Sequence, residues 1–135
     1  MKRSSFIYNL AVASTLLLVV GCSAPPPPPQ TPQDPRLTIQ PSLRSNIVAD
    51  GYVKVERNAA GFLSGSVLLR NLSASDDFAC EYSIEWTDET GSIIKPLFGD
   101  GWEKITIPAS SQKTLSGTSH FRTAAEVRFH LRKQK

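Results

Sequence analysis

The sequence predicts an all-β fold, an immunoglobulin-like antiparallel β-sandwich of about seven strands. Apolar and polar residues alternate with a period of two in residues 78–86 and 125–132, which is the pattern of half-buried strands. Turn signals rich in glycine, asparagine, aspartate and proline separate these segments from shorter strand candidates. The segments after residue 42 lack the helical period of an amphipathic helix.

The N-terminal segment resembles a signal peptide rather than part of this fold. Lys2 and Arg3 supply a positive charge, and residues 6–20 are mostly apolar. This apolar run is shorter than the roughly 17–25 residues with which a helix spans a bilayer. We therefore expect residues 1–21 to be a lipoprotein signal peptide that is removed.

The end of this segment, Val19-Val20-Gly21-Cys22, resembles the bacterial lipobox. Its chemistry needs the thiol of Cys22 to carry a diacylglyceryl group and a small residue before the cut. Two or more acyl chains give stable anchoring. The alternative is an ordinary secretory signal in which Cys22 later forms a disulfide with Cys80. We expect lipidation at Cys22. Because Ser23 rather than aspartate follows it, we also expect delivery to the outer membrane, with the domain facing the periplasm.

A proline-rich linker is expected to follow the lipidated cysteine over residues 22–42. Residues 24–35 contain seven prolines in twelve positions. Proline lacks an amide donor and fixes φ, so this stretch favours polyproline II over a helix or a sheet interior. It is expected to act as a semi-rigid spacer that lifts the domain, residues 43–135, away from the membrane.

Within the domain, the candidate strands follow one another at short intervals. They cover residues 46–50, 52–57, 63–69, 78–86, 93–97, 103–107, 112–116 and 125–132. The alternation in residues 78–86 puts Cys80 on the apolar face, which favours a buried thiol over a reactive one. In the turn after this strand, Asp88 can accept backbone hydrogen bonds and Gly91 can supply a positive φ.

The last strand presents a row of charged or polar residues on its outer face: Glu126, Arg128, His130 and Arg132. Such a row can meet an acidic partner or peptidoglycan. The alternative is a solvated face whose charges protect a possible edge strand from pairing with other chains.

The segment from about Ile47 to Lys133 resembles the YcfL-like family of small Gram-negative lipoproteins. The resemblance is carried by the Leu-Leu-Arg-Asn71 strand end, residues 82–91, Gly101-Trp102 with Ile105 and Ile107, and residues 127–132. Its most specific part is the Trp-x-Asp-x-x-Gly turn followed by a second tryptophan. The resemblance implies a lipid anchor, an immunoglobulin-like fold and no established biochemical activity, and it supplies no catalytic residues.

The loop from Phe98 to Trp102 is the candidate binding site. Two glycines make this loop mobile, and aromatic residues flank the carboxylate of Asp100, a combination that suits a partner-binding tip. The alternative is that Trp102 folds back and caps the sandwich. Phe98, Asp100 and Trp102 are therefore the candidate partner-binding residues, with both interpretations open.

Several function classes find little support in the sequence. The formal net charge of +3 falls when Lys2 and Arg3 are removed, and no basic cluster of a nucleic-acid-binding protein remains. His120 and His130 have no cysteine or carboxylate at metal-ligand spacing. Ser119-His120 is not a nucleophile–base motif, and no glycine-rich phosphate loop is present. We expect a protein that is not an enzyme and needs no cofactor beyond the lipid on Cys22.

The expected function is a non-enzymatic interaction or adaptor module in the cell envelope, anchored to the outer membrane by its lipid. Its expected partner is an envelope protein. The alternative is a lipoprotein that binds a small ligand or a glycan. A ligand site should be a concave pocket with convergent polar groups, whereas a partner site should be an exposed aromatic patch.

Overall fold

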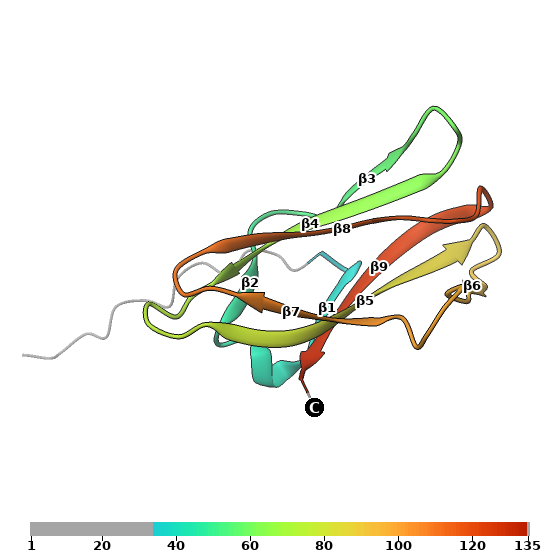
Figure 1. Cartoon of the computed structure of the whole chain (residues 1–135). Helices are drawn as coiled ribbons and strands as arrows, with labels where there is room; N and C mark the ends of the chain where they lie inside the picture. The colour runs from blue at the N-terminus through green and yellow to red at the C-terminus, as the bar shows by residue number, and fades with distance from the viewer. Residues whose placement is uncertain (1–33, 135) are drawn as a thin grey trace, which may run out of the picture.

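The computed structural model describes residues 34–134. The expected signal peptide, the lipidation of Cys22 and the linker up to residue 33 lie outside the described residues. Within them, nine strands and one turn of 3₁₀ helix make a β-sandwich (Figure 1), which confirms the predicted fold class. In chain order, the elements are β1 (Leu37–Ile39), η1 (Pro41–Leu43), β2 (Ile47–Ala49), β3 (Lys54–Arg57), β4 (Leu63–Asn71), β5 (Phe78–Asp88), β6 (Ile93–Ile94), β7 (Trp102–Ile107), β8 (Gln112–Thr118) and β9 (Ala124–Lys133).

The strands form two sheets. In sheet A, β9 lies between β1 and β5, and the other edge of β5 pairs with β7 along its first half and with β6 near its end. In sheet B, β4 is central, with β2 and β3 on one edge and β8 on the other. All pairs are antiparallel except β1 with β9, which is parallel. The two sheets lie face to face (Figure 1), as in other sandwiches.

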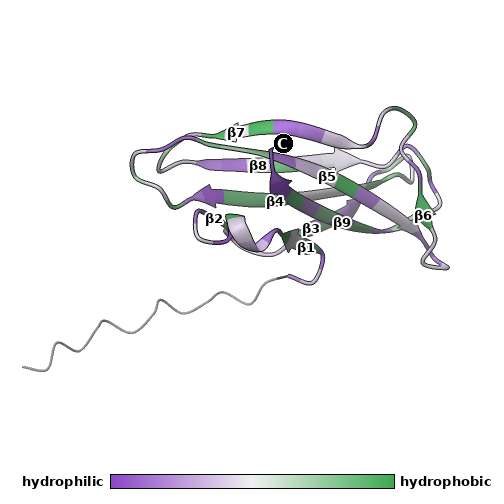
Figure 2. Ribbon diagram, turned by 90° about the horizontal axis from the view of Figure 1, so that it is seen from below, coloured by the Kyte–Doolittle hydropathy of each residue, from purple (hydrophilic) through white to green (hydrophobic). Residues whose placement is uncertain are grey.

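The core lies between the two sheets and is built from the inward-facing residues of the alternating strands. Figure 2 shows hydrophobic and hydrophilic residues alternating along β5 and β9. The buried cluster consists of Leu37, Ile39, Leu43, Ile47, Val53, Val67, Leu69, Cys80, Ile107, Leu115, Val127, Phe129 and Leu131. A Cβ added to Gly65 of β4 would lie 2.9 Å from a methyl group of Val127, so β4 packs closely over β9.

The expected turn after β5 is confirmed. Asp88 Oδ1 accepts hydrogen bonds from the backbone N–H groups of Thr90 and Ser92, and Gly91 adopts a φ of 82°. These hydrogen bonds lower the pKa of the Asp88 carboxyl below its ordinary value, with the hydroxyl of Thr90 as the largest contributor. The Trp86–Gly91 motif is therefore explained by the hairpin that it closes.

The side chain of Asn71, at the end of β4, links the loop between β4 and β5 to the connection between β7 and β8. This side chain is 2% exposed. Its amide nitrogen donates to the carbonyl oxygens of Asp76, Ile107 and Pro108, and its Oδ1 accepts from the N–H of Ser73. A buried amide with its polar atoms bonded to two backbone segments, residues 73–76 and 107–108, fixes the connection from β7 to β8.

Two expectations about the ends of the domain were wrong. Residues 37–42 were assigned to the linker, but Leu37–Ile39 form β1 and pair with β9. The sequence does not predict this strand, because a segment of three residues is too short to show a period of two. The last strand was considered a possible edge, but β9 is paired on both sides, with β1 and β5. Its outward charges therefore do not protect an edge.

An ion pair between the buried Asp34 and the partly exposed Arg36 fixes the start of the folded domain. Asp34 is 2% exposed and accepts two side-chain hydrogen bonds from Arg36, at 2.8 and 3.0 Å. It also accepts a hydrogen bond from the backbone N–H of Val53, and Arg36 donates to the Val53 carbonyl oxygen. These hydrogen bonds, led by that from the Arg36 side chain, lower the pKa of Asp34 to about 2. The ion pair therefore clamps the incoming chain to the segment before β3.

We expect Asp34→Asn to lower the free energy of unfolding by about 2 kcal/mol at pH 7, because it removes a buried charge-assisted pair. The folded-state pKa of about 2 lies below the ordinary value of 3.8, so this contribution is complete above about pH 4 and is lost as the pH falls through 2. Urea unfolding of the full chain across this pH range measures it. Glu89→Gln, an exposed carboxylate in the β5–β6 turn, is the control. A difference from wild type that is absent at pH 7, or that does not shrink on acidification, would contradict this role.

Candidate functional site: an aromatic groove at the open edge of the sandwich

The two sheets differ in width, and this difference opens the sandwich along one edge. A Cβ added to Gly117 of β8 would lie 2.6 Å from Ile84 Cδ1, so β8 packs over β5. Since β4 packs over β9, the strands β6 and β7 extend beyond sheet B. Ile107, beside the connection to β8, is fully buried, whereas Ile105 is only half-buried. The gap between β7 and β8 therefore widens away from that connection.

A groove of about 530 Å³ occupies this gap. Its floor is the inner face of β5, where Tyr82, Ile84 and Trp86 are half-buried rather than fully covered. The groove is further lined by residues 94–98, Gly101, Glu103 and residues 116–121. The sequence predicted a buried face for Tyr82 and Trp86. The structure shows that these aromatic side chains form a partly open surface.

The apolar rim of the groove consists of Leu97, Phe98 and Phe121. The side chain of Phe98 is 89% exposed, that of Leu97 52% and that of Phe121 40%. Ile93, 61% exposed, lies next to the groove residue Ile94. Large apolar side chains gathered at one site, beside a hollow, mark surfaces that contact another molecule.

A few polar groups lie among the aromatic residues of the groove. The Tyr82 hydroxyl donates to Glu103 Oε2 at 2.6 Å. Burial and the neighbouring carboxylate raise the pKa of Tyr82 to about 12, which keeps the phenol protonated at physiological pH. Lys95, Ser116, Thr118, Ser119 and His120 complete the polar lining. This arrangement suits binding through stacking and hydrogen bonds.

The three candidate residues of the Phe98–Trp102 loop are not brought together. Phe98 lines the groove, whereas Asp100 accepts a hydrogen bond from the Trp102 N–H at 3.1 Å and so closes its own turn. Gly99 and Gly101 have φ values of 64° and 74°, which this turn requires. Trp102 begins β7, and the Arg132 guanidinium lies 3.8 Å from the centre of its ring. Because Arg132 is on the outer face of sheet A, Trp102 packs on that face and lies outside the groove.

The two arginines of the row on β9 have acidic partners within the molecule. Arg132 Nε donates to Glu81 Oε2 at 2.8 Å, and the Glu81 side chain is only 9% exposed. Arg128 lies 3.6 Å from Glu126, and His130 lies 3.9 Å from Glu85. Opposite charges within the same face leave little excess charge for an acidic partner, which favours the solvated-face interpretation.

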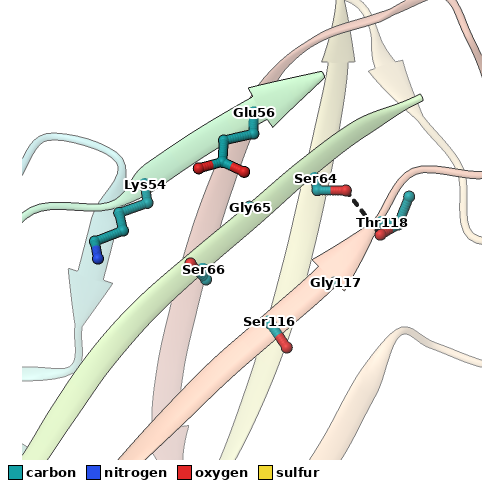
Figure 3. Close-up of a pocket in the computed structure, with 8 residues that line it drawn as sticks. All are labelled: Lys54, Glu56, Ser64, Gly65, Ser66, Ser116, Gly117 and Thr118. Carbon is teal, nitrogen blue, oxygen red and sulfur yellow. Dashed lines mark hydrogen bonds between the residues drawn. The ribbon is translucent and has the colours of Figure 1, made fainter. Parts of the chain in front are cut away.

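A second, smaller hollow of about 200 Å³ lies on the outer face of sheet B. Figure 3 shows Lys54 and Glu56 on β3 beside the hydroxyl side chains of β4 and β8, with Ser64 bonded to Thr118 at 2.9 Å. Ser116 and Thr118 line both this hollow and the aromatic groove. The strand β8 therefore separates this hollow from the aromatic groove.

Other candidate chemistry in residues 34–134 is sparse. Cys80 is fully buried, and burial raises the pKa of its thiol to about 11, as expected for a structural cysteine. No group of three His, Cys, Asp or Glu side chains in the described chain could hold a metal ion. None of the helices in this part of the chain is long and apolar enough to cross a membrane.

These features define the class of the protein: a small all-β sandwich with an aromatic groove at one edge. The family model of a protein of unknown function, DUF1425, matches residues 36–133, and the chain belongs to this family. The match begins at Arg36, just before β1. It therefore includes Arg36 and Val53, which are hydrogen-bonded to Asp34.

Two solved structures share the fold. The crystal structure of Campylobacter jejuni cj0090 has a TM-score of 0.63 at 17% identity, over 73% of this chain and 98% of that chain. A DUF1425 family member from Shewanella sp. pv-4 has a TM-score of 0.56 at 21% identity, over 66% of this chain and 77% of that chain. No curated protein matches the chain.

The different positions of Trp102 and Phe98 predict different effects of truncation. We expect Trp102→Ala to lower the free energy of unfolding by about 1–2 kcal/mol, because it removes the stacking on Arg132. Phe98→Ala should change it by less than about 0.5 kcal/mol, since that ring is exposed. Thermal unfolding of the full chain compares the two variants. Equal losses of stability would contradict the separation of Trp102 from the binding surface.

Proposed function

We propose that this chain is an outer-membrane-anchored periplasmic lipoprotein of the YcfL-like group, and that it acts as a non-enzymatic adaptor for an envelope protein. The observation that carries the proposal is the apolar rim beside the aromatic groove, where Phe98 is 89% exposed. Such surfaces are energetically unfavourable in water and become favourable when a partner covers them. The lipobox at Cys22 supports the anchor.

The chemistry of the groove favours binding over catalysis. The Tyr82 phenol is held protonated and is bonded to Glu103, so neither group is set up as a free general base. Tethering to a membrane would instead raise the local concentration of the groove near envelope partners. The adaptor role therefore needs only a surface and an anchor.

The second candidate function is binding of a small ligand or a glycan. The groove volume of about 530 Å³ falls within the range of ligand pockets, and Tyr82 and Trp86 offer rings for stacking. The groove continues onto an exposed apolar rim, which a partner's chain covers better than a compact ligand. We therefore favour the adaptor.

Site-specific photocrosslinking in intact envelopes tests the adaptor function. A photoreactive residue in place of Phe98 should crosslink to one specific protein, because this side chain is the most exposed of the apolar rim. The same residue in place of Ala74, an exposed position in the loop between β4 and β5, is the matched control. The crosslink should weaken when Phe121→Ser removes part of the rim.

Two results would contradict this function. Crosslinks that are equal at Phe98 and Ala74 would show random encounter rather than docking. Absence of any protein adduct at Phe98, together with a bound glycan or small molecule detected by mass spectrometry, would favour the second candidate.

A further inference from the structure

The outer edge of β8 carries backbone groups that no strand in the described residues pairs. β8 pairs only with β4. The backbone hydrogen bonds from Ser119 to Leu63 and from Asn71 to Ser111 show which residues of β8 turn toward β4. Because peptide groups alternate in direction along an antiparallel strand, the N–H and C=O groups of Thr114, Ser116 and Thr118 point toward the free edge.

From Thr114 onward, the edge of β8 lacks the usual protection against pairing. Natural edge strands carry charged residues, prolines or bulges that prevent a further strand from adding. The one charged residue of β8, Lys113, lies near its start. Residues 114–119 contain no charged residue and no proline, and β8 pairs with β4 in continuous register without a bulge. The unprotected stretch lies directly beside the aromatic groove, which residues 116–119 line.

In the described chain, sheet B ends at β8, whereas sheet A continues by one further strand position. Sheet A has β6 and β7 beyond β5, and sheet B has nothing beyond β8 within residues 34–134. A strand added to β8 would lie opposite β6 and β7 and would cover Tyr82, Ile84 and Trp86, which are now half-buried. It would also give the sandwich two sheets of equal width.

We propose that the groove accepts an extended segment of the partner as a fifth strand of sheet B, hydrogen-bonded to the free edge of β8. The inference rests on the proposed adaptor function and specifies how the partner docks. Main-chain hydrogen bonds to Ser116 and Thr118 supply affinity, and alternate side chains supply specificity. The inward residues of the segment are apolar and lie against Tyr82, Ile84 and Trp86. Its outward residues are polar and lie beside the hydroxyl groups of β8.

The occupant is a lone extended segment rather than a second copy of this chain. Antiparallel pairing of β8 with the β8 of another copy would place both inner faces on the same side. The partner copy's β5 would then need the position that β6 and β7 already occupy opposite the added strand. The chain's own proline-rich residues 24–35 are also unsuitable, because proline has no N–H to donate to β8.

Ser116→Pro and Ser116→Ala form a matched pair that tests strand addition. The proline removes the N–H that points to the free edge, whereas alanine removes only the outward hydroxyl. The N–H of Ser116 is not used in pairing with β4, so the proline is compatible with an edge strand. Circular dichroism and thermal unfolding of the full chain verify that both variants fold.

The probe is a displayed library of random peptides of about nine residues, long enough for one strand. Selection on the full mature chain in detergent micelles should enrich peptides with alternating apolar and polar residues. The enriched peptide should lose roughly tenfold or more in affinity for Ser116→Pro, because a backbone hydrogen bond is lost and the ring obstructs pairing. Its affinity for Ser116→Ala should stay close to that for wild type. N-methylation of alternate amides in the same peptide should abolish binding, which tests the mode without altering the protein.

Strand addition is rejected if no peptide is enriched, if enriched peptides lack alternation, or if Ser116→Pro and N-methylation leave affinity unchanged. The Phe98 photocrosslink separates this inference from the proposed function. A crosslink that survives Ser116→Pro would retain the adaptor function and exclude strand addition. Peptide capture without any Phe98 crosslink would retain the open edge and reject the adaptor.

Discussion

The unequal width of the two sheets is the constraint on which the surface of this protein depends. Gly117 allows β8 to pack directly over β5, since a Cβ at this position would lie 2.6 Å from Ile84 Cδ1. Because sheet B ends at β8, β6 and β7 have no strand opposite them in the described chain. The half-exposed aromatic floor, the apolar rim and the unpaired edge of β8 all follow from this single difference. The groove therefore forms because sheet B is one strand position narrower than sheet A.

The clamp at the start of the domain complements this arrangement. Asp34 and Arg36 hold the incoming chain beside Val53, and β1 then forms the edge of sheet A opposite to β6 and β7. The described chain thus enters the domain at one edge of the sandwich while the groove opens at the other. The lipid anchor that we propose would therefore be attached on the side away from the groove.

Much of the fold could be predicted from the sequence, and less of the site. Eight strands were predicted because alternation shows which residues face inward, but the three residues of β1 were too few to show it. Alternation also placed Tyr82 and Trp86 correctly on the inward face of their strand. It could not show that this face lacks a covering strand, because sheet width depends on pairing between distant segments. Trp102 was ambiguous for the same reason, since its partner Arg132 lies thirty residues further along the chain. Gly117, a glycine within a strand, was the one sequence signal of close packing beside the groove.

Amide hydrogen exchange in β8 of the full chain tests the open edge most directly. The N–H groups of Leu115 and Gly117 turn toward β4, whereas those of Ser116 and Thr118 turn toward the free edge. We therefore expect slow exchange at residues 115 and 117 and fast exchange at 116 and 118, resolved residue by residue by nuclear magnetic resonance. Equally slow exchange at all four amides would show that something already covers the edge and would contradict the account.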